Sequence, residues 1–109
     1  MMGAETLAWH PLFPESELPP GEIRGVDLPD GTRIAIYNVD GVFYATQDRC
    51  THGEASLSED GVLCDHFVEC SWHFGTFDVI TGEPGLTPCE IALCTYPTKI
   101  ENGIVHVEA

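Results

Sequence analysis

Glycine and proline interrupt this chain at short intervals along its whole length. The 109 residues include 11 glycines and 8 prolines, and these two residue types end helices and mark turns. Short segments rich in β-branched and aromatic residues remain between them, and helical periodicity is nearly absent. Many short strands joined by regular turns indicate an all-β fold, an antiparallel sandwich or barrel.

Two turn dipeptides, Asp40-Gly41 and Asn102-Gly103, are each flanked by apolar segments and are typical of β-hairpins. The hairpin segments are residues 33–39 with 42–45, and 96–101 with 104–107. Further strands are expected over residues 22–28, 67–70 and 76–79. We find no linker or repeat that would divide the chain, and residues 1–109 are expected to form a single domain.

The charge is strongly negative, with 18 acidic residues against 4 basic ones and a net charge of −14. Such a surface repels nucleic acids and anionic lipid, and it attracts basic patches on proteins. Plain solubility is the alternative explanation. No apolar run approaches the ~20 residues that a membrane helix needs, and the first residues lack the basic start of a secretory signal. We therefore expect a cytoplasmic protein that binds neither nucleic acid nor membrane.

Five cysteines are many for a small chain of this kind. Their odd number argues against a disulfide framework and favours metal ligation by some of them. The key spacing is Cys50-Thr51-His52, then 17 residues, then Cys70-Ser71-Trp72-His73. Two loops that each offer one thiolate and one imidazole can hold a [2Fe–2S] cluster if they face each other. One iron then lies between Cys50 and Cys70, and the other between His52 and His73.

The cysteines and histidines of this segment allow two other interpretations. A structural zinc site could use the same four ligands, but zinc fingers usually place two cysteines on one loop and two histidines on a helix. Cys64-Asp65-His66 is a second Cys-x-His pair, but only three residues separate His66 from Cys70, too few for two opposed loops. Cys64, Cys89 and Cys94 are then left over, and each is expected to be a small buried hydrophobic residue.

The motifs resemble those of the Rieske ferredoxins of bacterial aromatic-ring-hydroxylating oxygenase systems. The resemblance is carried by residues 50–53 (CTHG), 68–73 (VECSWH), 77–79 (FDV) and 81–82 (TG), and it extends to residues 18–22, 36–41, 43–46 and 96–101. It implies a β-sandwich with an inserted cluster-binding subdomain at about residues 46–85. It also implies a small carrier, not itself an enzyme, that moves single electrons from a flavin-containing NAD(P)H reductase to a terminal oxygenase.

The chain departs from the family pattern at Ser71, where proline is usual, and at Phe74, where glycine is usual. High-potential Rieske proteins have two hydroxyl residues after the second histidine and a disulfide between the loops. Here the corresponding positions hold Gly75 and Phe77, and Ala55 and Trp72. The resemblance and the negative charge therefore predict a reduction potential at the low end of the Rieske range, roughly −150 mV.

The sequence thus predicts a monomeric Rieske ferredoxin with one [2Fe–2S] cluster. One alternative is a small Rieske subunit of a reductase such as nitrite reductase, which would form a stable complex with a large catalytic subunit. The other is a zinc-stabilised binding module, which would be colourless.

Overall fold

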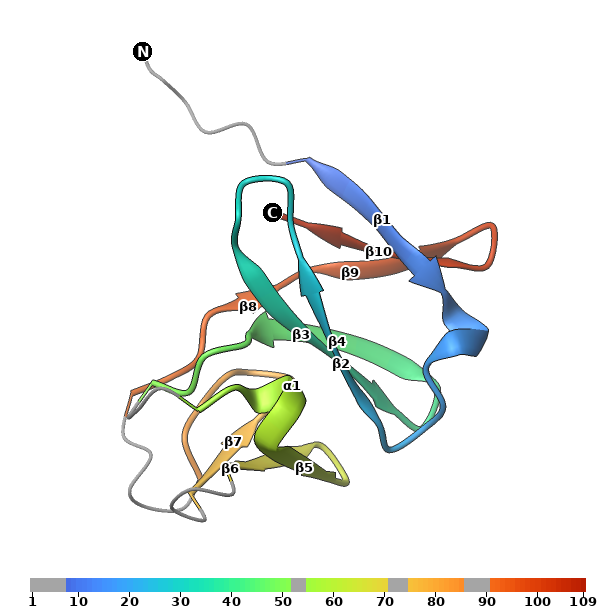
Figure 1. Cartoon of the computed structure of the whole chain (residues 1–109). Helices are drawn as coiled ribbons and strands as arrows, with labels where there is room; N and C mark the ends of the chain where they lie inside the picture. Colours follow the sequence, from blue (N-terminus) through green and yellow to red (C-terminus); the bar gives the residue numbers. More distant parts are fainter. Residues whose placement is uncertain (1–7, 52–54, 71–74, 86–90) are drawn as a thin grey trace.

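The structure, a computed structural model, describes residues 8–51, 55–70, 75–85 and 91–109. Within them the chain forms three antiparallel sheets (Figure 1). The first contains β1 (Trp9–Pro14), β10 (Ile104–Glu108) and β9 (Thr98–Glu101); the second contains β2 (Ile23–Asp27), β3 (Arg33–Val39), β4 (Val42–Gln47) and β8 (Thr95–Tyr96); and the third contains β5 (Gly61–Cys64), β6 (Phe67–Cys70) and β7 (Thr76–Asp78). A 3₁₀ turn, η1 (Glu15–Glu17), and a short helix, α1 (Leu57–Asp60), complete the described elements.

Both hairpins expected from the turn dipeptides are present. Asp40 and Gly41 join β3 to β4 with φ angles of 51° and 91°, and Asn102 and Gly103 join β9 to β10 with 53° and 76°. Positive φ at both central residues is the requirement of the tight turn whose twist matches that of the paired strands. The turn chemistry of these dipeptides therefore fixes the register of two strand pairs.

The first two sheets pack face to face around one apolar core. Its members come from both sheets and from the segments that join them, and they are Phe13, Leu18, Leu28, Ile34, Ile36, Phe43, Ala45, Val105 and Val107. Inward-facing residues from two antiparallel sheets are the basis of a β-sandwich. The sandwich expected from the sequence is confirmed.

Strand β3 is buried on both faces. Ile34 and Ile36 point into the sandwich core, whereas Ala35 and Tyr37 belong to a second core, and all four are fully buried. A strand covered on both sides has no polar face, which explains why its sequence does not alternate. The second core is completed by α1 and the third sheet, which are inserted between β4 and β8 (Figure 1).

Helix α1 has four residues. Across the described parts of the chain, no helix is long and apolar enough to cross a membrane.

Candidate metal centre

Cys50 lies three residues beyond the end of β4, at the start of the first predicted ligand loop. Its side chain is buried, and its N–H donates a hydrogen bond of 3.0 Å to the carbonyl oxygen of Ala55. Arg49 and Ser56, the residues just outside this pair, form an isolated antiparallel bridge. The two ends of the loop are therefore held together like the base of a hairpin.

Cys70 is the last residue of β6, at the start of the second predicted loop. Burial alternates along β6, so that Val68 and Cys70 face the interior while Phe67 is exposed. The Cys70 N–H donates a hydrogen bond of 2.8 Å to the carbonyl oxygen of Gly75. Both cysteines thus begin loops that are closed by a bond from the cysteine to the fifth residue after it.

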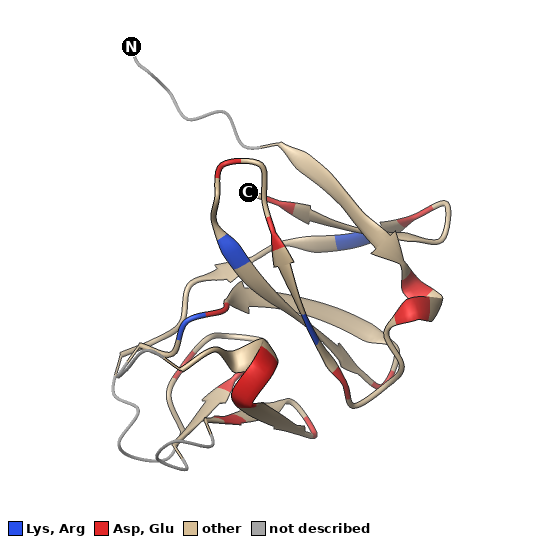
Figure 2. Cartoon of the chain, viewed as in Figure 1, with Lys and Arg blue, Asp and Glu red and all other residues tan. Residues whose placement is uncertain are grey.

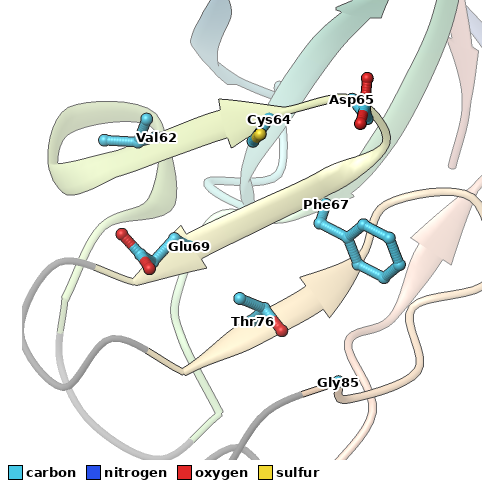
Figure 3. Close-up of a pocket in the computed structure, with 7 residues that line it drawn as sticks. All are labelled: Val62, Cys64, Asp65, Phe67, Glu69, Thr76 and Gly85. Carbon is cyan, nitrogen blue, oxygen red and sulfur yellow. The ribbon is translucent and has the colours of Figure 1, made fainter.

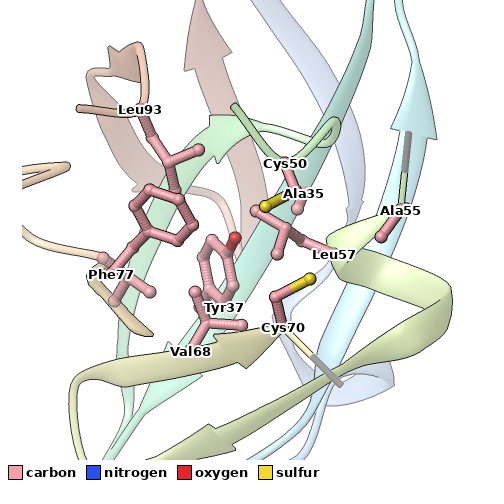
Figure 4. Packing of buried hydrophobic residues seen from close by; sticks show 10 residues of the cluster. Ala35, Tyr37, Cys50, Ala55, Leu57, Val68, Cys70, Phe77 and Leu93 are labelled. Carbon is pink, nitrogen blue, oxygen red and sulfur yellow. The ribbon is translucent and has the colours of Figure 1, made fainter. Parts of the chain in front are cut away.

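The fold places the first residues of these two loops in one core. Cys50 and Cys70 belong to the same buried cluster, and both sulfur atoms are drawn in Figure 4 with Leu57 and the other members of the cluster. The two cysteines share this core although 19 residues lie between them in the sequence.

The part of the site that the structure describes fits an iron–sulfur cluster. One iron of a Rieske cluster takes two cysteine thiolates, and the buried Cys50 and Cys70 are the two that would provide them. His52 and His73, and also Ser71, Trp72 and Phe74, lie outside the described residues, so the histidine ligands stay a prediction. No group of three metal-ligating side chains occurs in the described ranges, which hold only two of the four predicted ligands.

A comparison with known families decides between the possible metal sites. The model of the Rieske [2Fe-2S] domain matches residues 8–97. The chain belongs to the Rieske [2Fe-2S] domain family. Its cofactor is accordingly a Rieske-type [2Fe–2S] cluster, and the resemblance seen in the sequence motifs is confirmed.

Several curated proteins and solved structures are similar to this Rieske chain over most of its length. The ferredoxin component of the p-cumate 2,3-dioxygenase system of Pseudomonas putida is 54% identical over 88 residues, which are 81% of this chain and 75% of that one. The biphenyl dioxygenase ferredoxin subunit of Pseudomonas sp. strain KKS102 is 53% identical, with 84% of each chain covered. The Sphingomonas yanoikuyae B1 ferredoxin matches with a TM-score of 0.87 at 35% identity, over 94% of this chain and 99% of that one.

The leftover cysteines of this Rieske chain differ from the sequence expectation. Cys64 and Cys94 are exposed, so the prediction that they are buried is wrong for both; Cys89 lies outside the described residues. Cys64 pairs with Phe67 across the β5–β6 hairpin, and directly paired residues point to the same face of a sheet. Its thiol therefore lies on the outer face, in a hollow of about 640 Å³ (Figure 3), and points away from Cys70.

Tyr37 is a buried polar residue of the Rieske core that the sequence patterns did not single out. Its hydroxyl lies 2.8 Å from Thr46 Oγ1, and the Thr46 hydroxyl donates to the Gln47 carbonyl oxygen at 2.7 Å. Because Thr46 has only one hydroxyl proton, Tyr37 is the donor in the first bond. Burial raises the pKa of Tyr37, so the phenol stays neutral.

Proposed function

We propose that this chain carries single electrons from a flavin-containing NAD(P)H reductase to the terminal oxygenase of an aromatic-ring-hydroxylating system. Cys50 and Cys70 hold one iron of its cluster, and His52 and His73 hold the other. When bound, the cluster accepts and releases one electron. The protein portion supplies the ligands, shields the thiolate side from water and presents a surface to each partner.

The observation that carries this proposal is the buried pair of thiols, Cys50 and Cys70, in a chain 54% identical to a dioxygenase ferredoxin component. A partner oxygenase is supported by a second solved relative, the ferredoxin in the complex with the oxygenase of carbazole 1,9a-dioxygenase. That relative is 41% identical with a TM-score of 0.86, over 91% of each chain.

The charge distribution favours partners with basic docking surfaces. Basic residues contact acids: Arg24 lies 3.0 Å from Glu17, Arg33 lies 3.1 Å from Asp27, and Lys99 lies 3.7 Å from Glu101. Their positive charge is therefore neutralised locally, and the excess of acids dominates the surface. Figure 2 shows acidic residues on all three sheets and on α1.

The proposal is tested by spectroscopy of the purified protein and of single-cysteine variants. We expect a red-brown protein with two irons and two sulfides per chain. After reduction by dithionite, its electron paramagnetic resonance (EPR) spectrum should have an average g of about 1.9, as Rieske centres give. Cys50→Ser and Cys70→Ser should lose this signal, whereas the matched Cys64→Ser on the outer face should keep it. A colourless zinc protein, or signal loss only in Cys64→Ser, would contradict the ligand set.

Function is then tested with an NAD(P)H ferredoxin reductase and a terminal oxygenase in the same reaction. Omitting this protein should abolish product formation, and adding it back should restore it.

The competing function is that of a small reductase subunit. A small subunit of an NADH-dependent nitrite reductase from Mycobacterium tuberculosis has a TM-score of 0.84, but at 22% identity this likeness concerns the fold alone. Stable co-purification with a large catalytic subunit would favour that alternative.

A further inference from the structure

A buried carboxylate lies at the base of the first ligand loop. Asp48 is only 4% exposed and precedes Cys50 by two residues. A buried carboxylate is costly unless hydrogen bonds and an opposite charge compensate it. The partners of Asp48 therefore indicate what the residue does.

Three of these partners lie at the far end of the same loop. Asp48 Oδ1 accepts from the Ser58 N–H at 2.8 Å, and Oδ2 accepts from the Ser56 hydroxyl at 2.6 Å. The backbone carbonyl oxygen of Asp48 accepts from the Leu57 N–H at 2.7 Å. One residue before the loop thus binds three consecutive residues after it.

These bonds also hold the start of α1. The first N–H groups of a helix have no partner within the helix, and a helix of four residues does not persist by itself. Asp48 accepts from the first two of these groups, from Leu57 through its backbone carbonyl oxygen and from Ser58 through its side chain, and Ser56 Oγ accepts from the next, that of Glu59. Helix α1 therefore depends on a residue on the opposite side of the loop.

Arg33 of β3 compensates the charge of Asp48. Its Nε lies 3.4 Å from Asp48 Oδ2, and its carbonyl oxygen accepts from the Asp48 N–H at 3.2 Å. The Arg33 guanidinium is also paired with the exposed acids Asp27 and Glu59. Room for it is left by Gly25, where a Cβ would collide with the guanidinium and with Ser58 Oγ.

We propose that Asp48 is a positioning residue for the cluster. By fastening both ends of the loop to each other and to β3, it fixes the place of Cys50 relative to Cys70. The inference rests on the proposed ligand role of Cys50. A carboxylate that only stabilises the fold would not affect the cluster. A positioning residue does, because displacing the loop changes the geometry at the iron.

The experiment compares Asp48→Ala and Asp48→Asn with Glu59→Gln in the cluster-loaded protein. Asn keeps one acceptor for Ser58 but places an NH₂ group towards Arg33, so its effect should be smaller than that of Ala. Glu59→Gln is the control. It removes one negative charge that is paired with Arg33, as the Asp48 variants do, but it leaves the hydrogen bonds of Asp48 in place. We expect both Asp48 variants to shift the EPR line positions and to release iron to a chelator faster, about tenfold for Asp48→Ala, as loss of buried hydrogen bonds implies. The control should match the wild type in both.

A purely structural role would lower thermal stability and leave the EPR lines of the retained cluster unchanged; that result overturns the proposal. If Asp48→Ala fails to fold, Asp48→Asn and Ser56→Ala carry the test, since each weakens the Ser56–Asp48 bond and leaves the Asp48 acceptor for the Ser58 N–H in place. The ligand proposal is checked separately by Cys50→Ser. If Cys50→Ser loses the cluster while the Asp48 variants behave as wild type, only the positioning role is wrong.

Discussion

Tyr37 places a phenol in the same core as Cys50 and Cys70, and its proton is already committed to Thr46. Burial favours the neutral phenol and raises its pKa above the ordinary value of 10.0. In the unfolded chain the same phenol is exposed to water and ionises near its ordinary pKa. Above that pH the folded protein therefore binds more protons at Tyr37 than the unfolded chain does.

This difference predicts a loss of stability in alkali. As the pH rises past about 10, the free energy of unfolding should fall by up to about 1.4 kcal/mol per pH unit, because the unfolded chain gains by ionising and the folded one does not. Tyr37→Phe keeps the ring and removes the titrating group. The unfolding free energy of this variant, measured with urea from pH 8 to 11, should decrease less with rising pH than that of the wild type. At pH 8 the variant should be less stable by about 1 kcal/mol, because one hydrogen bond is lost. Parallel curves for the two proteins would contradict this account.

The residues of the site differed in how well they could be predicted. The spacing of the Cys-x-His and Cys-x-x-His pairs singled out Cys50 and Cys70, and the fold places both in one buried cluster. Tyr37 and Asp48 could not be predicted in this way, because a tyrosine in a strand or an aspartate before a cysteine has no distinctive pattern. Their roles arise from Thr46, Ser56 and Ser58, partners that only the fold brings within hydrogen-bonding distance.

At the scale of the elements, Gly61 lies where α1 packs against β6. This glycine ends α1, and a Cβ there would lie 2.5 Å from the Leu57 carbonyl oxygen and 2.9 Å from Val68 Cγ2. Gly61 is also the direct partner of Cys70 in the β5–β6 pair. A side chain at this position must therefore push α1 and β6 apart.

Gly61→Ala should destabilise the protein and also loosen the cluster. Overpacking of this kind costs about 1–3 kcal/mol, and the displacement reaches Cys70. Gly41→Ala is the matched control: its φ of 91° makes alanine strained, by about 1–2 kcal/mol, but nothing lies within 4 Å of the new Cβ. Both variants should melt earlier, while only Gly61→Ala should lose visible absorbance during storage. Equal cluster loss in the two would refute the local effect.

Most strands were predictable from segments rich in β-branched and aromatic residues, and β2, β6 and β7 lie where the sequence indicates them; β1 and β5 were not predicted. The β3–β4 and β9–β10 hairpins follow from Asp-Gly and Asn-Gly. Strand β5 begins with glycine and is only four residues long, and its turn has the weak dipeptide Asp65-His66. Strand β1 contains Pro11 and Pro14, which argue against a central strand; the fold accepts them because β1 lies at a sheet edge and is bulged between Pro11 and Phe13.

At the scale of the whole molecule, β3 joins the two cores, and the negative charge covers both. Ile34 and Ile36 pack in the sandwich core, whereas Ala35 and Tyr37 pack in the second core, beside α1 and the third sheet. Both cores therefore depend on the same strand. Cys50 and Cys70, where the predicted ligand loops begin, belong to the second of these cores.

A net charge of −14 should make electron transfer to its physiological partners sensitive to salt. Attraction between an acidic carrier and a basic docking surface raises the association rate by about 10–1000-fold at low ionic strength, and salt screens it. The second-order rate constant for reduction by the reductase should therefore fall about tenfold or more between 20 and 500 mM NaCl, measured by stopped flow at limiting protein concentration. Reduction by a small neutral donor under the same conditions is the control and should change little. If the reductase rate is flat or rises with salt, the acidic surface serves solubility alone, and docking is governed by apolar contacts around the cluster.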